Sequence, residues 1–543
     1  MLIEPSARSY EQLVDGFVWD IPQSLNIADV ICDRHANSTP LATAIIEDTE
    51  KGVRHYSFAE TKRLTDNLAL SFQEFGIRRG DRVVISLGQD VEALLAHLAC
   101  FKLGAISVPV AGLYSGEGLA FRIIDSGAQL IVTNREGADK LRDLDIPALC
   151  HVVVINQQAQ QDEVDFGSLL QGKDAELIIA DTAADDAALI FYTSGTTGAP
   201  KGVLHAHRMA NAHIPCIQLG FEMAPQIGDV FWTASDWSWL GSLGDLVFPA
   251  LYLGHPVVVT PGRFSVQRAY EVMQRHKITC PFLATAVLRK MSKEPAPKRG
   301  LSVRAIMTGG EAMSPEVLKW SQQTFGVPVN DEFGSTESNQ TAVACSTLYK
   351  TPDGSVGRIT PGKRVSILDT QGVALAAGEI GEIAVWHDNP SNMLNYWNEP
   401  DKTAQKYLNG WLLTGDRGMR DEQGFLYYYG RLDNLILVNG LRVGPEEVEA
   451  QLLAHEKVSE VGVIGVPDDR AGEAIVALIQ LKDGIEGSDE LVSELQRFVK
   501  AHLAAHCYPK RIEFVDELPV TSTGKICREK LRGLLVESLV ALG

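Results

Sequence analysis

The chain has 543 residues, of which 45% are hydrophobic and 22% are charged, a globular composition that excludes intrinsic disorder and fibrous structure. Forty-nine Lys and Arg against 69 Asp and Glu give a formal net charge of −20, so no overall positive field favours nucleic acid or an anionic membrane. A phosphate-rich ligand would therefore need local groups to hold it. At roughly 150 residues per domain, the length predicts about three to four domains or subdomains.

The eight cysteines are scattered, without C-x-x-C pairs or zinc-ligand spacing, which is typical of reduced core residues in intracellular proteins. Residues 1–17 lack the basic and apolar regions of a signal peptide, and no apolar run approaches the ~20 residues of a membrane span. We therefore expect a cytoplasmic protein without integral membrane association, either a monomer or a homodimer.

Helical and strand patterns alternate in the first half of the chain. Short apolar strands separated by helices indicate parallel sheets covered on both faces. The expected helices are 57–75 and 91–103, and the expected strands are 82–87, 105–110, 130–133, 230–233, 256–260 and 306–308.

From about residue 365 the pattern changes to short strands with little helix between them, at 365–368, 381–386, 424–429 and 435–438. A smaller α/β unit follows, with helices 445–454 and 489–504 and strands 458–466, 474–481 and 511–515. We expect an α/β protein with a large N-terminal domain (1–430) of parallel sheets with helices on both faces, including a β-rich subdomain at about 356–430. A small mobile α+β C-terminal domain (431–543) would follow, joined at the short stretch 430–433, a tight joint suited to rotation.

The strongest local signal is the string YTSGTTGAPKG at 192–202, directly after the apolar run 187–191. Its backbone amides, hydroxyls and one ammonium group can surround the oxygens of a polyphosphate. The spacing differs from that of the ordinary P-loop. A surface turn would explain the glycines but not the whole string. The residues expected to hold phosphates are Thr193, Ser194, Gly195, Thr196, Thr197, Gly198 and Lys201.

This string resembles the phosphate-binding loop of the AMP-forming acyl-CoA and aryl-CoA synthetases, a superfamily that also contains peptide-synthetase adenylation domains and luciferases. Further strings resemble that family in the expected order over nearly the whole chain. The resemblance implies an acid–thiol ligase that uses ATP, Mg²⁺ and CoA and passes through an acyl-adenylate. The strings are TGGE at 308–311, DEFGSTE at 331–337, WLLTGD at 411–416, GRLD at 430–433 and PVTSTGK at 519–525.

The resemblance also implies a nucleotide site. The glycines after the strand 306–308 would let a flat adenine approach the backbone, and Phe333 would present an aromatic face to it. Asp416 would accept hydrogen bonds from the ribose hydroxyls, and Arg431 would meet ribose or phosphate. The implied set is Gly309, Gly310, Glu311, Asp331, Glu332, Phe333, Gly334, Asp416 and Arg431.

Catalysis is implied at three residues. Thr336 and Glu337 would meet the phosphates and Mg²⁺, with Glu337 as the metal ligand. Lys525 would bridge the substrate carboxylate and the α-phosphate and stabilise the charge that builds during attack. Asp433 would be the pivot between two domain orientations. Because the substrate carboxylate is the nucleophile, we interpret His205 and His207 as structural or gating residues, not as general bases.

Within the superfamily, the strings SDWSW at 235–239 and YPKRIEF at 508–514 resemble those of medium-chain acyl-CoA synthetases and their acetate and propionate relatives. Acetate-specific relatives have a tryptophan at the position of Gly334, so the resemblance implies a medium-chain, branched or aromatic acid and not acetate. The sequence departs from the family in its polar residues 338–340, which could bind a polar acyl substituent. The expected acyl wall is Trp239, Gly309, Gly334, Ser338, Asn339 and Val343.

For CoA, the string VNGLR at 438–442 resembles the segment that lines the pantetheine tunnel, so Asn439, Gly440, Leu441 and Arg442 are the expected contacts. Arg470 lies one place earlier than the family's basic residue, which weakens its assignment to the CoA phosphates. Two other functions stay open. One is an adenylating enzyme that loads a separate carrier protein, which is less favoured because the chain ends 18 residues after Lys525 with no fused carrier. The other is a non-enzymatic nucleotide- or acyl-binding protein, which would be expected to lack Lys525, Glu337 or Asp416.

Overall fold

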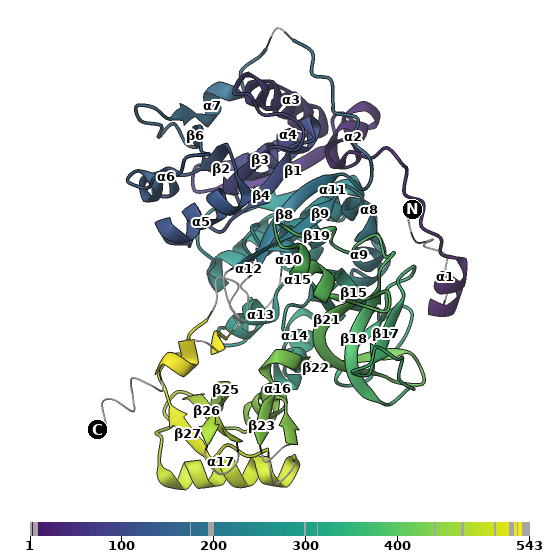
Figure 1. Ribbon diagram of the computed structural model, residues 1–543, viewed down its shortest axis with the longest axis vertical. Coiled ribbons are helices and arrows are strands. Elements are labelled where there is room, and N and C mark those ends of the chain that lie inside the picture. The colour runs from purple at the N-terminus through teal and green to yellow at the C-terminus, as the bar shows by residue number, and fades with distance from the viewer. Residues whose placement is uncertain are drawn as a thin grey trace.

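The computed structural model describes residues 3, 9–173, 175–193, 200–297, 300–311, 313–438, 441–468, 472–503, 507–520, 526–528 and 530–534. The chain forms a large lobe and a small C-terminal lobe, which lies at the bottom of Figure 1 in light green and yellow. In this described part, no helix combines the length and the apolar character that crossing a membrane requires.

The first sheet of the large lobe has eight strands in the order β19-β9-β8-β4-β3-β5-β6-β7, and the strands from β8 to β7 are parallel. Val83 and Ile85 pack into one apolar cluster and Val84 into another, so both faces of this sheet are covered. The strands are β3 Arg82–Ser86, β4 Ile106–Pro109, β5 Leu130–Thr133, β6 His151–Val154, β7 Val164–Asp165, β8 Ala187–Thr193, β9 Lys201–Ala206 and β19 Asn395–Tyr396. The helices nearby in the chain are α3 Phe58–Glu74, α4 Val91–Leu103, α5 Gly116–Ser126, α6 Arg135–Leu141 and α7 Phe166–Leu169.

The second sheet has fourteen strands and changes from parallel to antiparallel at β14 (Val329–Ser335), which pairs in parallel with β13 and antiparallel with β15. The β-rich part is therefore continuous with a parallel sheet, and it includes β15 (Asn339–Val343), which precedes the stretch expected from the sequence. The other strands are β1 Thr43–Thr49, β2 Gly52–Ser57, β10 Phe231–Thr233, β11 Val257–Val259, β12 Cys280–Phe282, β13 Ile306–Thr308, β16 Ser355–Ile359, β17 Val365–Leu368, β18 Ile380–Trp386, β20 Tyr407–Leu408, β21 Trp411–Arg420 and β22 Phe425–Arg431.

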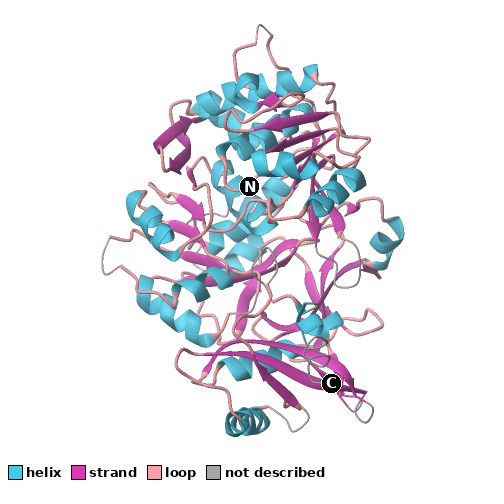
Figure 2. Cartoon of the chain, turned by 90° about the vertical axis from the view of Figure 1, so that its left-hand side faces the viewer, coloured by secondary structure: helices cyan, strands magenta, loops and turns pink. Residues whose placement is uncertain are grey.

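A layer of short helices packs with both sheets of the large lobe, because its apolar residues share one core with β3 and with β1, β10 and β11. Figure 2 shows that helices lie among the strands of the large lobe. The helices of this layer are α8 Met209–Ala212, α9 Ile214–Gly220, α10 Leu240–Ser242, the π-helix η2 Leu243–Val247 and α11 Phe248–Tyr252. The remaining helices of this lobe are α1 Tyr10–Gly16, η1 Asp29–Asp33, α2 Arg34–Ser38, α12 Val266–Arg275, α13 Thr285–Met291, α14 Pro315–Phe325 and α15 Pro400–Gln405.

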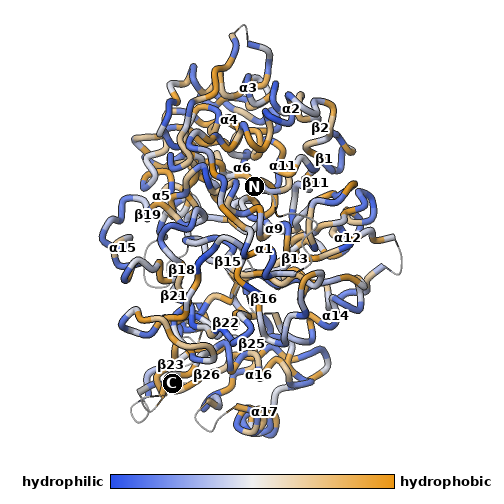
Figure 3. Tube along the Cα trace, turned by 90° about the vertical axis from the view of Figure 1, so that its right-hand side faces the viewer, coloured by the Kyte–Doolittle hydropathy of each residue, from blue (hydrophilic) through white to orange (hydrophobic). Residues whose placement is uncertain are grey.

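The small lobe is a five-stranded sheet covered on one face by two helices, as expected for an α+β unit. Leu491, Leu495 and Val499 recur every four residues and form the buried stripe of α17, whose polar side lines the outer edge of the lobe (Figure 3). The elements are β23 Ile436–Val438, β24 Leu441–Val443, α16 Pro445–Leu453, β25 Val458–Asp468, β26 Gly472–Leu481, α17 Asp489–His502 and β27 Arg511–Phe514.

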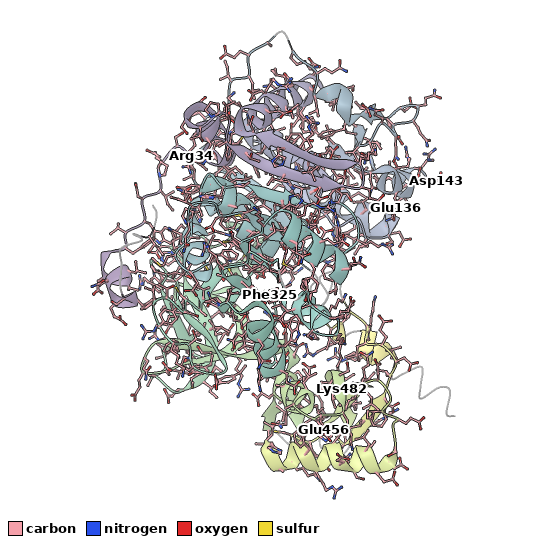
Figure 4. The ribbon with its side chains drawn as sticks, turned by 180° about the vertical axis from the view of Figure 1, so that it is seen from behind. Arg34, Glu136, Asp143, Phe325, Glu456 and Lys482 are labelled. Atoms are coloured by element: carbon pink, nitrogen blue, oxygen red, sulfur yellow. The ribbon has the colours of Figure 1, made fainter. Side chains whose placement is uncertain are left out.

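The two lobes meet where β22 ends at Arg431 and the short 3-10 helix η3 (Leu432–Asn434) begins. Ion pairs between described residues cross the joint: Lys293 Nζ lies 3.0 Å from Glu460 Oε1, and Arg417 Nη1 lies 2.6 Å from Glu447 Oε1. Figure 4 shows Glu456 and Lys482 on the small lobe and Phe325, the last residue of α14, on the large lobe above it.

Candidate active site

The string at 192–202 includes the end of β8 and the start of β9, which pair antiparallel with Thr193 opposite Lys201. The Lys201 ammonium lies 5.5 Å from the centre of the Tyr396 ring on the neighbouring strand β19. Ser194, Gly195, Thr196, Thr197 and Gly198 lie outside the described residues, as do Asn439, Gly440 and Lys525.

Thr336 and Glu337 occupy the turn between β14 and β15, and this turn contacts β9 and β19 of the other sheet. The backbone carbonyl of Thr336 lies 2.9 Å from His205 Nε2, and the Tyr396 hydroxyl donates a hydrogen bond of 2.6 Å to Glu337 Oε1. Thr193 and Thr336 thus both lie at carboxyl ends of sheet strands, the usual ligand-binding edge of α/β sheets.

His205 is uncharged, because burial lowers its pKa to about 3. Its neighbour at Nε2 is a carbonyl oxygen, which only accepts, so the ring carries its proton on Nε2 and donates to Thr336. His207 is also buried, and its Nδ1 accepts a hydrogen bond of 3.2 Å from the Ile27 backbone. This geometry supports the interpretation of both histidines as structural.

Asp416 and Arg431 lie side by side on β21 and β22. Arg431 Nη1 lies 3.3 Å from Asp416 Oδ1, and its Nε lies 3.2 Å from Asp433 Oδ1 in η3. Burial raises the pKa of Asp416 to about 6, Arg431 opposes that rise, and the Glu337 carboxylate adds to it. Gly415 has φ +80°, and a Cβ there would lie 2.9 Å from Arg431 Nη2, so both the backbone and the guanidinium require glycine.

The adenine-side residues follow β13 and line β14. The Glu332 side chain lies over Gly309, with its Cγ 2.8 Å from the position that a Cβ of Gly309 would take, and Gly310 has φ +96°. Glu311 forms an ion pair with Arg289 of α13, and burial raises the pKa of Asp331 to about 7. Phe333 is buried in the apolar cluster of the β-rich part, with its ring 5.6 Å from that of Tyr428.

The expected acyl wall is partly assembled. Trp239 and Thr336 line a cavity of about 70 Å³ with Thr193, and Val343 is fully buried against Gly220. At Gly334, a Cβ would lie 2.7 Å from the backbone oxygen of Asn339. Close backbone packing therefore requires glycine here, whether or not the acyl group also needs the space.

The Ser338 hydroxyl and the Asn339 amide nitrogen have protein partners, whereas Asn339 Oδ1 is buried without one among the described residues. The Ser338 hydroxyl lies 3.0 Å from that of Ser335, and the Asn339 amide donates to the Ser391 carbonyl. On the CoA side, Leu441 is half exposed at the start of β24, and Arg442 pairs in register with Leu437.

Sequence reasoning missed Tyr396 and Lys363, and it named Gln340 only as one of the polar residues 338–340. Tyr396 reaches Glu337 only through the pairing of β19 with β9, which joins positions almost 200 residues apart. Lys363 is a lysine with only 8% of its surface exposed, and its ammonium contacts the Gln340 backbone oxygen.

Known proteins are similar to this chain over nearly its whole length. Residues 32–397 match the family described as AMP-binding enzyme, and residues 447–525 match the AMP-binding enzyme C-terminal domain. The chain is 32% identical to the acetyl-coenzyme A synthetase of Bacillus subtilis (strain 168), over 97% of this chain and 95% of that one.

Solved structures with the same fold have names that refer to different ligands or substrates. One is the benzoate CoA ligase from Burkholderia xenovorans LB400, at a TM-score of 0.82 and 26% identity over 93% of this chain and 99% of that one. Another is ATP-bound MatB from Rhodopseudomonas palustris, at a TM-score of 0.85 and 25% identity over 94% and 98%. The chain belongs to the AMP-binding enzyme family and is an AMP-forming ligase of the acyl-CoA synthetase type.

Proposed function

We propose that this enzyme joins a medium-chain, branched or aromatic carboxylic acid to CoA, and that acetate is a poor substrate. ATP, the acid and CoA would give acyl-CoA, AMP and pyrophosphate through an acyl-adenylate. The observation that carries the proposal is the meeting of the β8–β9 hairpin, the Thr336–Glu337 turn and the Asp416–Arg431 pair at one edge of the large lobe. The preference for a larger acid rests on the resemblance, in which acetate-specific relatives have a tryptophan at the position of Gly334.

In the first half-reaction, the substrate carboxylate attacks the α-phosphorus of ATP and pyrophosphate leaves. The hairpin string holds the phosphates, and ionised Asp416 accepts hydrogen bonds from the ribose hydroxyls. Arg431 holds Asp416 in place and meets ribose or phosphate. Lys525 places its ammonium between the carboxylate and the α-phosphate and stabilises the added negative charge.

The donor set at Glu337 fits Mg²⁺. Tyr396 donates to Oε1 of this carboxylate, which leaves Oε2 for the ion, and Mg²⁺ in nucleotide enzymes takes one or two carboxylates with substrate phosphates and water. When bound, the ion neutralises charge on the phosphate oxygens. Glu337 would hold it, and Tyr396 would orient Glu337.

In the second half-reaction, the small lobe turns about Asp433, removes Lys525 and brings the 438–442 segment to the thiol path. Asn439, Gly440, Leu441 and Arg442 would line this path, and the thiolate would attack the acyl carbonyl and release AMP. Two ion pairs between described residues of the lobes can be broken by side-chain rotation, which is compatible with such a turn.

The test is AMP formation from ATP with and without CoA, across acetate, butyrate, branched C4–C5 acids, hexanoate, octanoate and benzoate. We expect CoA-dependent AMP release on acids larger than acetate, lost in Lys525→Ala and retained in Lys482→Ala, an exposed lysine of the same lobe. Adenylation without thioester formation would indicate a carrier protein as acceptor and contradict the proposal. So would equal activity with acetate.

A further inference from the structure

A buried glutamine lies next to the expected acyl wall. Gln340 of β15 lies opposite Gly334 of β14, next to an irregularity at which the register shifts between Phe333 and Gly334. The Gln340 Cα is 3.1 Å from the point that a Cβ of Gly334 would occupy. Phe333 and its partner Ala342 belong to the apolar cluster of the β-rich part, which does not include Gln340. Gln340 therefore adjoins Gly334 outside that cluster.

The Gln340 amide is unpaired within the part of the chain that the structure describes. Its side chain is fully buried, yet neither Oε1 nor Nε2 makes a hydrogen bond to any residue that the structure describes. Leaving a buried donor and acceptor unpaired costs free energy, and native structures retain such groups mainly where a ligand or water completes them. Gln340 thus offers one donor and one acceptor to a missing partner.

A buried ammonium group contacts the backbone at this position. Lys363 Nζ contacts the Gln340 backbone oxygen and lies 2.9 Å from the Ser391 hydroxyl. Burial lowers the pKa of Lys363 to about 8, and the Asp245 and Glu332 carboxylates oppose that decrease, so the ammonium stays largely protonated at neutral pH. One positive charge therefore lies among two carboxylates in the interior.

A His–Asp pair extends the cluster toward the cavity beside Trp239. His213 Nδ1 lies 2.6 Å from Asp245 Oδ1, and within the described part of the chain His213 Nε2 has no hydrogen-bond partner. Asp245 belongs to the π-helix η2, an element found frequently at functional sites. A Cβ on Gly244 would lie 3.5 Å from the His213 ring and 2.7 Å from Leu240, which lines the cavity.

We propose that this polar cluster (His213, Asp245, Glu332, Gln340 and Lys363) binds a hydroxyl group on the acyl part of the substrate, which makes the preferred acid a hydroxylated medium-chain or aromatic acid. A hydroxyl donates to Oε1 and accepts from Nε2 of one amide. A plain hydrocarbon would leave the amide unpaired, and a second carboxylate would add a third negative charge to a buried site with one lysine. This inference rests on the proposed function and specifies a hydroxyl substituent on the acid.

The experiment compares kcat/KM for matched acids: hexanoate with its 3-, 4-, 5- and 6-hydroxy forms, benzoate with the three hydroxybenzoates, and adipate as the dicarboxylate. We expect at least one hydroxy acid to exceed its parent tenfold or more. Gln340→Met, which keeps the volume and removes the amide, should lower that ratio about tenfold.

Thermal stability gives a readout besides activity. Gln340→Met should leave the Tm of the free enzyme unchanged or raise it, because it removes an unpaired buried amide. The matched control is Gln218→Met, which should lower the Tm, since the Gln218 amide bonds both the N–H (2.6 Å) and the C=O (3.3 Å) of Ile3.

Three results would overturn the inference: parent and hydroxy acids used equally, adipate preferred over every hydroxy acid, or a Gln340→Met ratio equal to that of the wild type. In each case turnover on the parent acids would leave the proposed function standing. Absence of CoA-dependent AMP release on every acid would overturn both.

Discussion

The Tyr396 hydroxyl donates a 2.6 Å hydrogen bond to Oε1 of Glu337 and so joins β19 of one sheet to the turn after β14 of the other. Burial raises the pKa of Tyr396, and the nearby Glu337 carboxylate raises it further, so the hydroxyl remains a donor at any working pH. The same ring lies 5.5 Å from the Lys201 ammonium. One tyrosine thus positions two groups that the proposed mechanism assigns to the phosphates and Mg²⁺.

Tyr396→Phe removes this donor and leaves the ring. A hydrogen bond to a charged group contributes about 1.5–3 kcal/mol, so we expect kcat/KM for ATP to fall about tenfold or more and the Mg²⁺ requirement to shift upward. Pyrophosphate exchange over a Mg²⁺ titration measures both. Tyr427→Phe is the control, because its hydroxyl bonds Asp421 at 3.3 Å on the far part of β22. An unchanged Mg²⁺ dependence in Tyr396→Phe would contradict the positioning role.

His205 should act by donating to Thr336 and not by exchanging protons. Because burial lowers its pKa to about 3, no titration of this ring should appear in the rate between pH 6 and 9. We expect His205→Leu to lower kcat roughly tenfold, the value of one hydrogen bond, with the shape of the pH–rate profile retained. Loss of the acidic limb in the variant would identify His205 as a general base and contradict this account.

Asp416 should link ATP affinity to pH. Its pKa is raised from 3.8 to about 6, so the carboxyl becomes protonated as the pH falls through 6 and can no longer accept both ribose hydroxyls. KM for ATP should rise about fivefold between pH 6 and pH 5. In Asp416→Asn, KM should be high at pH 7.5 and nearly flat toward pH 5. A parallel rise in the variant would assign the effect to another group.

The same shift predicts a stability change in the free enzyme. A carboxyl whose folded-state pKa is raised contributes stability that is full below pH 3.8 and is lost as the pH rises through about 6. The Tm of the wild type should therefore fall relative to that of Asp416→Asn as the pH rises from 4 to 7. Calorimetry across that range tests it, and a constant difference would mean that Asp416 does not titrate there.

The Lys293–Glu460 ion pair should bias the lobes toward the orientation of this structure. Exposed pairs contribute about 0–1 kcal/mol, so Glu460→Gln should change the ratio of adenylation to thioester formation by roughly two- to fivefold and leave folding intact. Glu494→Gln is the matched control, because its pair with Lys457 lies within the small lobe. Equal changes in both half-reactions for Glu460→Gln would argue against a lobe-specific effect.

Much of the fold could be predicted from local sequence patterns. The helices expected at 57–75, 91–103, 445–454 and 489–504 agree with α3, α4, α16 and α17 to within two residues at each end, because their apolar spacing and caps are local signals. Residues 411–416 were recognised only as a motif, and they begin the ten-residue strand β21, whose partners lie in distant segments.

The site was predictable where a motif is contiguous and not where tertiary pairing builds it. Thr336, Glu337 and Asp416 follow from strings, whereas Tyr396 and Lys363 reach them through contacts between separate segments. Gly334 shows a second limit of sequence reasoning. From the sequence, its missing side chain suggests free space for the acyl group. In the structure, the Asn339 backbone already approaches that space.

The most direct test of the central claim is a competition with limiting CoA. Equimolar acetate, hexanoate and benzoate are supplied with ATP, and the acyl-CoA products are quantified by mass spectrometry. The account predicts that hexanoyl-CoA or benzoyl-CoA dominates and that AMP matches total thioester. Dominant acetyl-CoA would contradict it.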